Sequence, residues 1–150
     1  MKIWVHEKIN KFYTQVRFNG LFLTLHLYIH KTINRVFTFF IFGRLDISID
    51  AGAKLIGRKN FKIGKNFGAG KHLWMEAVSK YGNQCFTPKI IIKDNVSLSD
   101  FNHIGAVNYI EIGNNVLFGS HCYVTDHNHG IYSGDINAQS NPMIAPIKRM

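Results

Sequence analysis

Cysteine is scarce in this chain of 150 residues. The two cysteines, Cys85 and Cys122, lie far apart, so they form neither a CxxC metal motif nor the framework of a disulfide-rich fold. This scarcity favours a reducing, cytoplasmic setting. The length suits one domain with a hydrophobic core of its own, because a second full domain would need a longer chain.

Acidic residues are also few, with nine Asp and Glu against 18 Lys and Arg, which gives a formal net charge of +9. Such an excess raises three classes of partner: nucleic acid, an anionic membrane surface, or an anionic ligand. The basic residues are scattered, and the chain has no basic run with interleaved aromatics, no helix-turn-helix pattern and no RNP pattern. We therefore expect no nucleic-acid partner.

The sequence also lacks a long apolar run that is free of charge. The most apolar stretch, residues 21–42, carries Lys31 and Arg35 near its middle, and each charge would cost a few kcal/mol at a bilayer centre. No small-residue cleavage site follows it, which argues against a signal peptide. The sequence therefore predicts neither a membrane-spanning helix nor a secretory leader.

Residues 1–44 form a basic, apolar segment for which we predict helices. Apolar residues recur at i, i+3, i+4 and i+7 in its first part, and Asn19-Gly20 is a suitable helix end. The second part also has helical spacing, although its first leucines alternate as in a strand. Two interpretations of the segment remain open. It is either a helical cap packed on the core or a basic amphipathic anchor on the cytoplasmic face of a membrane.

From residue 45 onward, aliphatic residues recur every six positions. The three sets are Ile63, Ala69, Met75; Ile92, Leu98, Ile104; and Ile112, Phe118, Val124. Six is even, so this period keeps the same residues on one face of a strand, whereas a helix would spread them around its surface. Six residues bury little alone, and only stacked repeats build a core. The pattern predicts an all-β solenoid, with Gly64, Gly113, Asn114 and Asn115 at corners that turn sharply or need positive φ.

Two breaks in the six-residue period are informative. Eight residues separate Ile104 from Ile112, which predicts a two-residue bulge near Asn108-Tyr109. Seventeen residues separate Met75 from Ile92, which leaves about eleven extra residues for a loop around positions 78–88. Loops that leave a repeat stack tend to carry recognition. We therefore expect the 78–88 loop to lie outside the core.

These hexads, together with the sequence IEIGNNVLFGSHCYVTDHNHGIYSG, resemble the hexapeptide-repeat acyltransferases. Within that family the chain looks closest to the branch that O-acetylates lipopolysaccharide, capsule or other cell-surface sugars. The resemblance covers roughly residues 46–147. It implies a left-handed parallel β-helix with three hexads per coil, a homotrimer, and acetyl-CoA bound between neighbouring subunits. The domain division that follows is a helical segment at 1–44 and a β-helix at 45–150.

The resemblance also implies the site. Acetyl transfer to a sugar hydroxyl needs a base, and the unperturbed pKa of histidine suits that task. The family's general base falls on the first His of the TDHNHG motif, His127, with Asp126 to fix its tautomer and His129 to orient a substrate. Asn128 in the motif, and Asp100 and His103 in the preceding LSDFNHIG stretch, are expected to bind substrate. No metal is required.

For two other histidines and one inward-facing asparagine we expect roles outside the catalytic site. Asn102 occupies an inward position in its hexad, so a structural role is expected. His121 falls at a hexad corner and is expected on the surface or at an interface, and His72 has no identified partner. The sugar acceptor is expected to be a surface polysaccharide or its lipid-linked precursor. A basic N-terminal segment would suit such an acceptor through peripheral contact with the inner face of the membrane.

Two alternatives stay open at this point. A trimeric zinc carbonic anhydrase has the same scaffold, and His103, His121 and His127 would then converge on zinc. The second alternative rests on the family's further hexads, which are expected to follow the DHNH loop and complete the acetyl-CoA groove, whereas this sequence ends at Met150. A catalytically inactive, truncated scaffold or partner subunit is the corresponding expectation.

Overall fold

The computed structural model describes residues 2–129 and 146–148, and the side chains of residues 6–128. Two helices come first, α1 (Lys2–Asn19) and α2 (Leu21–Phe42), and Gly20 with φ of 78° separates them. This confirms the helical prediction for both parts of the segment. None of the helices in the described residues has the length and hydropathy needed to cross a membrane.

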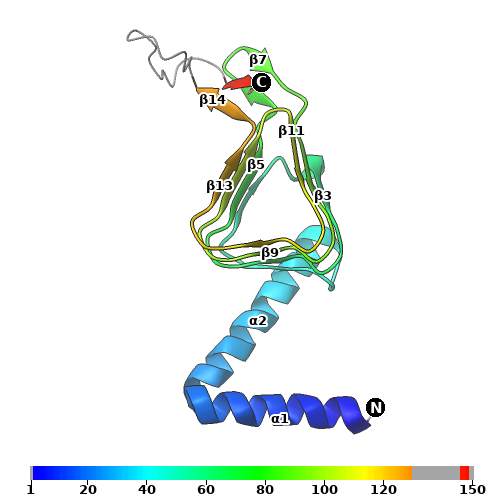
Figure 1. Ribbon diagram of the computed structural model, residues 1–150, viewed down its shortest axis with the longest axis vertical. Helices are drawn as coiled ribbons and strands as arrows, with labels where there is room; N and C mark the ends of the chain where they lie inside the picture. Colours follow the sequence, from blue (N-terminus) through cyan, green and yellow to red (C-terminus); the bar gives the residue numbers. More distant parts are fainter. Residues whose placement is uncertain (1, 130–145, 149–150) are drawn as a thin grey trace.

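Three parallel sheets follow the helices and form the three sides of a triangle (Figure 1). One contains β1 (Ser48–Ile49), β4 (Gly68–Ala69), β9 (Ser97–Leu98) and β12 (Leu117–Phe118). The second contains β2 (Lys54–Ile56), β5 (Trp74–Ala77), β10 (His103–Ala106) and β13 (Tyr123–Thr125). The third contains β3 (Phe61–Ile63), which follows the short 3-10 helix η1 (Arg58–Asn60), then β8 (Lys89–Ile92) and β11 (Tyr109–Ile112).

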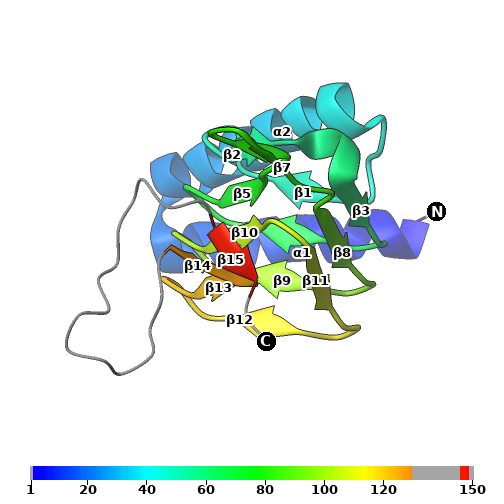
Figure 2. The ribbon, with the colours of Figure 1, turned by 90° about the horizontal axis from the view of Figure 1, so that it is seen from above.

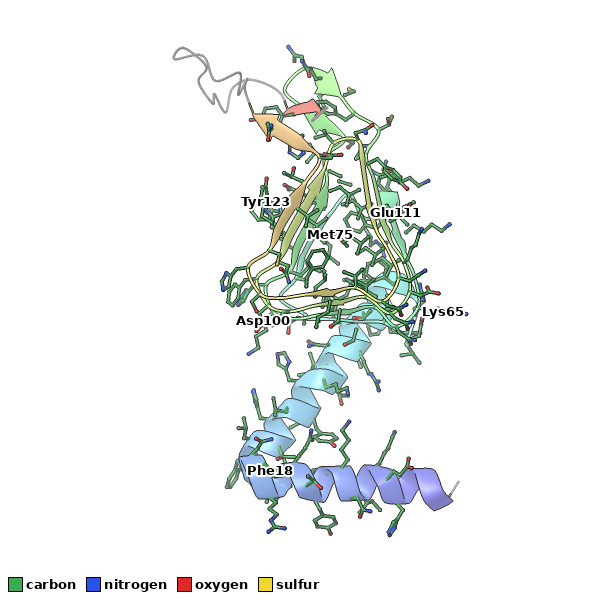
Figure 3. All side chains as sticks on the ribbon, in the orientation of Figure 1. Phe18, Lys65, Met75, Asp100, Glu111 and Tyr123 are labelled. Atoms are coloured by element: carbon green, nitrogen blue, oxygen red, sulfur yellow. The ribbon has the colours of Figure 1, made fainter. Side chains whose placement is uncertain are left out.

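The chain visits the three sheets in turn, and successive passes stack on one another (Figure 2). The six-residue sets predict the register: Ile63, Ile92 and Ile112 are aligned in one sheet. Ala69, Leu98 and Phe118 are aligned in the sheet of β4, β9 and β12. Met75, Ile104 and Val124 are aligned in the sheet of β5, β10 and β13. Met75 points into the interior of the triangle (Figure 3). This architecture is compatible with a β-helix.

The core fills the triangle with the aligned residues of the successive passes. Its largest fully buried side chains include Phe67, Leu73 and the isoleucines at 47, 49, 90, 92 and 104. Asn102 lies among them at 2% exposure, where its Nδ2 donates to Ser99 O at 2.8 Å and its Oδ1 accepts Cys122 N–H at 2.8 Å. Both ends of this amide are therefore satisfied inside the core, which confirms the structural role expected for Asn102.

Two corners of the triangle carry ladders of residues with positive φ. At one corner, Asn66, Asn95 and Asn115 have φ of 54°, 58° and 59°, and their side-chain amides bond in series at 2.9 and 3.0 Å. At the next, the rings of His72, Phe101 and His121 stack with centroids 4.8 and 4.9 Å apart. These contacts between passes help offset the cost of left-handed backbone at residues other than glycine.

Of the four residues predicted at corners that turn sharply or need positive φ, only Asn115 adopts positive φ. Gly64 is required for another reason. A Cβ there would lie 2.4 Å from Asp94 Oδ1 and 2.5 Å from the backbone carbon of Lys93, so the next pass approaches too closely for any side chain. Gly113, at the equivalent place two passes later, has nothing within 4 Å.

Both predicted breaks in the period occur at the same corner of the triangle. Residues 107 and 108 lie between β10 and β11, in agreement with the predicted two-residue insertion. The predicted 78–88 loop forms an antiparallel hairpin outside the triangle, made of β6 (Lys80–Tyr81) and β7 (Gln84–Cys85). Also at this corner is β14 (His127–His129), paired antiparallel with β15 (Pro146–Lys148) (Figure 1).

Only the last part of α2 packs on the sheets, whereas α1 and the first part of α2 extend away from the triangle (Figure 1). The buried Thr38 hydroxyl accepts Ile49 N–H at 2.8 Å, and Asn34 donates to Asp50 at 3.2 Å and accepts Ala51 N–H at 3.0 Å. Only the end of α2 therefore forms the helical cap on the core that the sequence predicts.

Candidate functional site

The corner that carries β14 and the β6–β7 hairpin also holds a cavity of about 420 Å³. Its lining comes from the end of β5, the hairpin and β14, and includes Glu76, Ser79, Tyr81 and His127. The chain reaches this place because β13 ends at Thr125 and the next residues leave the triangle to form β14. His127 of the TDHNHG motif therefore borders this cavity.

His127 is 7% exposed, and its ring is held by its Nδ1 atom. This nitrogen lies 3.0 Å from Asp126 Oδ1 and 2.9 Å from Thr125 Oγ1. A carboxylate can only accept a hydrogen bond, so the contact with Asp126 places the proton of the neutral ring on Nδ1. The acceptor lone pair then belongs to Nε2, which is the tautomer that a general base requires.

Asp126 is in turn fixed by three backbone N–H groups from the corner between β10 and β11. Val107 donates to Oδ1 at 2.9 Å, and Asn108 and Tyr109 donate to Oδ2 at 2.8 and 2.7 Å. Burial by itself would raise the pKa of the Asp126 carboxyl, but these hydrogen bonds and the one from the His127 ring together hold that pKa below its usual range. Asp126 is therefore an anion oriented toward the ring.

A second histidine and carboxylate pair lies on the neighbouring passes. His103 Nε2 is 3.3 Å from Glu76 Oε1, and the Trp74 indole donates to Glu76 Oε2 at 3.1 Å. The His103 ring stacks on Trp74 with centroids 4.2 Å apart, and its other neighbour is Tyr123 at 4.9 Å. Lys54 Nζ lies over the Trp74 ring at 3.8 Å from its centroid. These contacts restrict the His103 ring to one orientation.

Gly105 leaves an open space between the two pairs. A Cβ built on Gly105 would lie 3.5 Å from His103 Nε2, 3.7 Å from Glu76 Oε1 and 3.7 Å from His127 Cε1. Glu76, Gly105 and Thr125 are aligned in register on three successive passes, so the middle position of this outward row has no side chain. The gap brings His103, Glu76 and His127 to one place.

The structure does not bring every predicted residue to this place. Asp100 lies at another corner of the triangle (Figure 3), where its Oδ1 accepts Lys71 N–H at 2.7 Å. Asn128 is half-buried next to His127 in β14. The backbone of His129 belongs to β14, but its side chain lies outside the described residues.

The histidines of the zinc alternative do not gather within the chain. His121 is exposed at the corner where it stacks on Phe101, whereas His103 and His127 lie beside Gly105. Among the described side chains, no three His, Cys, Asp or Glu residues are grouped as ligands for a metal ion.

One curated relative is similar to this chain over more than half its length. The match is 33% identical over 87 residues, with a protein of Escherichia coli K12 described as "Putative lipopolysaccharide biosynthesis O-acetyl transferase WbbJ". It covers 58% of this chain and 38% of WbbJ, so the chain spans well under two thirds of that relative. The similarity supports an acyltransferase-like relationship. No family model matches the sequence, and no solved structure matches it.

Sequence reasoning missed Glu76, Gly105 and Thr125 as parts of the site. The six-residue period itself contains the signal that finds them. Met75, Ile104 and Val124 are the aligned inward residues, so the residue after each of them must be aligned and must point outward. The excursion at 78–88 places Glu76 29 positions before Gly105, and no motif marks either residue.

Proposed function

We propose that this protein transfers an acetyl group from acetyl-CoA to a hydroxyl of a saccharide, with His127 as the general base. The observation that carries the proposal is the His127 ring, which is buried beside a cavity with Nδ1 held by Asp126 at 3.0 Å. The similarity to WbbJ over 58% of the chain supports the same class of reaction.

In the proposed reaction, His127 Nε2 takes the proton of the saccharide hydroxyl as its oxygen attacks the thioester carbonyl carbon. The C–O bond forms and the tetrahedral intermediate collapses with cleavage of the C–S bond. The leaving thiolate then takes the proton back from Nε2, so the ring ends neutral. Asp126 stabilises the transient imidazolium and keeps the proton of the neutral ring on Nδ1. Acetyl-CoA supplies the acetyl group as a substrate.

The acceptor hydroxyl is proposed to enter the space at Gly105. There it would meet His127 on one side and the His103–Glu76 pair on the other. Sugar hydroxyls both donate and accept hydrogen bonds, which suits a carboxylate next to an imidazole. His103 is proposed as a substrate-binding residue, and Glu76 as the residue that positions it.

The finer features of the resemblance belong to the same proposal. They are a left-handed β-helix of hexapeptide repeats, a homotrimer, and acetyl-CoA bound between neighbouring subunits in a cytoplasmic enzyme. The acceptor is proposed to be a surface polysaccharide or its lipid-linked precursor. The parallel register of the three sheets supports the β-helix, and the name of the matched relative supports a lipopolysaccharide-related acceptor. The homotrimer, the acetyl-CoA site and the cytoplasmic location rest on the resemblance alone.

The test is acetyl transfer by the full chain, with acetyl-CoA and saccharides released from lipopolysaccharide as probes. Thiol release reports the loss of CoA, and mass spectrometry of the saccharide reports the new ester. We expect His127→Ala to lower turnover by about 10²- to 10⁴-fold, the usual contribution of a general base. His121→Ala is the matched control, because that ring is exposed at another corner.

Turnover by His127→Ala at the wild-type rate would reject the base assignment. Absence of both CoA release and ester formation with wild-type protein would reject the proposed function.

A further inference from the structure

The helix α2 carries a continuous apolar stripe on its exposed side. Its members are Phe22, Leu25, Ile29, Ile33, Val36 and Phe40. With 3.6 residues per turn they fall within a sector of about 80° of the helix surface. All six are exposed, and the two phenylalanines reach 88% and 81%. Nothing in the described part of the chain covers this stripe.

The rest of the chain occupies the opposite side of α2. Thr24 and Thr38, both fully buried, lie there. The charged residues of the helix, Lys31 and Arg35, also face away from the stripe, because they line the groove between α2 and α1. The stripe is therefore uncharged, and its residues are exposed on the side of α2 that faces away from the groove with α1.

The stripe is larger than the apolar patches of ordinary monomers. Taking usual side-chain areas, the six residues expose roughly 800 Å² per chain, whereas the largest patch on a typical monomer is about 300–600 Å². The same area is close to the ~800 Å² that each partner contributes to a standard protein interface. The size of the stripe therefore suits a specific protein partner.

The spacing of the stripe indicates what kind of partner fits. The intervals along the helix are 3, 4, 4, 3 and 4, so the pattern repeats after 11 residues: Phe22 with Ile33, Leu25 with Val36, and Ile29 with Phe40. An 11-residue apolar repeat is typical of helices that pack along one another with little or right-handed supercoiling. A second helix with the same repeat would match the stripe along its whole length.

We propose that α2 is a self-association surface, and that its stripe packs against the α2 stripe of a second copy of this chain. Pairing the stripes would bury no charge and would leave Lys31 and Arg35 on the outer sides of the helix pair. An anionic membrane surface fits less well, because both basic residues of α2 face away from the stripe. The inference does not depend on the proposed acetyl transfer.

The first test compares the mass of the full chain, by sedimentation velocity over a range of concentrations, with that of two double variants. Ile29→Gln with Ile33→Gln changes the stripe, and we expect it to weaken association by at least about 100-fold. Leu23→Gln with Leu27→Gln is the matched control, because these leucines are exposed on the same helix outside the stripe. The control is expected to associate as wild type does. Any assembly through the sheets is shared by all three proteins.

The second test does not depend on a loss of association. In a background with Cys85→Ser and Cys122→Ser, chains with Ile29→Cys alone, or mixed with chains carrying Ile33→Cys, are expected to form disulfide-linked dimers on mild oxidation. Parallel packing favours links between Ile29→Cys chains, and antiparallel packing favours mixed links. Leu23→Cys is expected to stay unlinked.

Three outcomes would overturn the proposal. One is equal mass for wild type and the stripe variant at every concentration. Another is cross-linking of Leu23→Cys as readily as the stripe cysteines. The third is a stripe variant with unchanged mass that no longer sediments with phosphatidylcholine–phosphatidylglycerol vesicles to which wild type binds, since the occupant would then be a membrane.

Discussion

The substitution Asp126→Asn gives the sharpest test of how the candidate site is held together. The carboxylate accepts three backbone N–H groups and the His127 ring, with Asn108 and Tyr109 on Oδ2 and Val107 and His127 on Oδ1. The side-chain amide of asparagine has one oxygen, so it can accept hydrogen bonds at only one of the two carboxylate oxygen positions. Placing that oxygen at the Oδ2 position leaves a single backbone donor, Val107 N–H, without an acceptor. We expect the amide to adopt this orientation.

Two effects follow from that orientation. Val107 is buried, so its unpaired N–H costs about 1–3 kcal/mol, and the two retained bonds weaken as they lose the charge. Together these losses predict a decrease of about 2–4 kcal/mol in the free energy of unfolding. The amide NH₂ would also face His127 Nδ1 and donate to it, so the ring proton moves to Nε2. The general base is then lost without removal of the histidine.

The tautomer can be read directly by two-bond ¹H–¹⁵N correlation of the His127 ring at a pH where it is neutral, and the stability by urea unfolding. Asp100→Asn is the control. Among the described residues, its Oδ1 accepts Lys71 N–H alone, and the amide oxygen can keep that bond. We therefore expect a loss of less than about 1 kcal/mol and no change at His127. A proton that stays on Nδ1 in Asp126→Asn, or wild-type stability of that variant, would refute the role given to Asp126.

Three further predictions concern the same framework. The pKa of Asp126 is lowered in the folded state. Its contribution to stability should therefore be complete above the unfolded pKa of about 3.9 and should be lost as pH falls through the folded value. Urea unfolding at a series of pH values should show this loss in wild type and not in Asp126→Asn. Gly64→Ala should lower the free energy of unfolding by about 2–4 kcal/mol through its clash with the next pass. Gly113→Ala should be neutral or stabilising by up to about 1 kcal/mol. Equal effects of the two substitutions would show that the close approach of the next pass is not the reason for Gly64. Gly105→Ala should change stability by less than about 1 kcal/mol, because its Cβ makes only ordinary contacts. It should raise the KM for the saccharide, because the methyl group fills the gap beside His127. An unchanged KM would show that Gly105 is not part of the proposed acceptor site.

The six-residue period predicts the alignment of the sheets, because an even period fixes which side chains point inward on every pass. Ile92, Leu98 and Ile104 were found from the sequence in this way, and all three are buried. The period does not reveal how the corners are made. The left-handed residues include His72 and Phe101, whose stacked rings hold a backbone conformation that aromatic residues rarely adopt. Such a contact forms only between residues of successive passes, so no local sequence pattern predicts it.

The site was predictable only in part, for a similar reason. The TDHNHG motif identified Asp126 and His127 by resemblance, and the spacing of the hexads permits both to lie near the end of one sheet. Glu76 lies 29 positions before Gly105 and has no motif of its own. Asp100 sits close to His103 in the sequence, but a corner separates them, and its carboxylate caps a backbone N–H instead. Residues that are close in sequence can therefore lie apart where a corner of the triangle falls between them.

The β6–β7 hairpin lines the cavity but does not alter the alignment of the core residues. Met75 pairs with Ile104 after 29 positions, whereas Leu55 pairs with Met75 and Ile104 with Val124 after 20. The longer pass therefore returns to the same register as the shorter ones, and the stack of aligned core residues is indifferent to what the hairpin contains. Ser79 and Tyr81 line the cavity beside His127. Insertions or exchanges in this segment therefore change the cavity wall, during evolution or in the laboratory, at little risk to the scaffold.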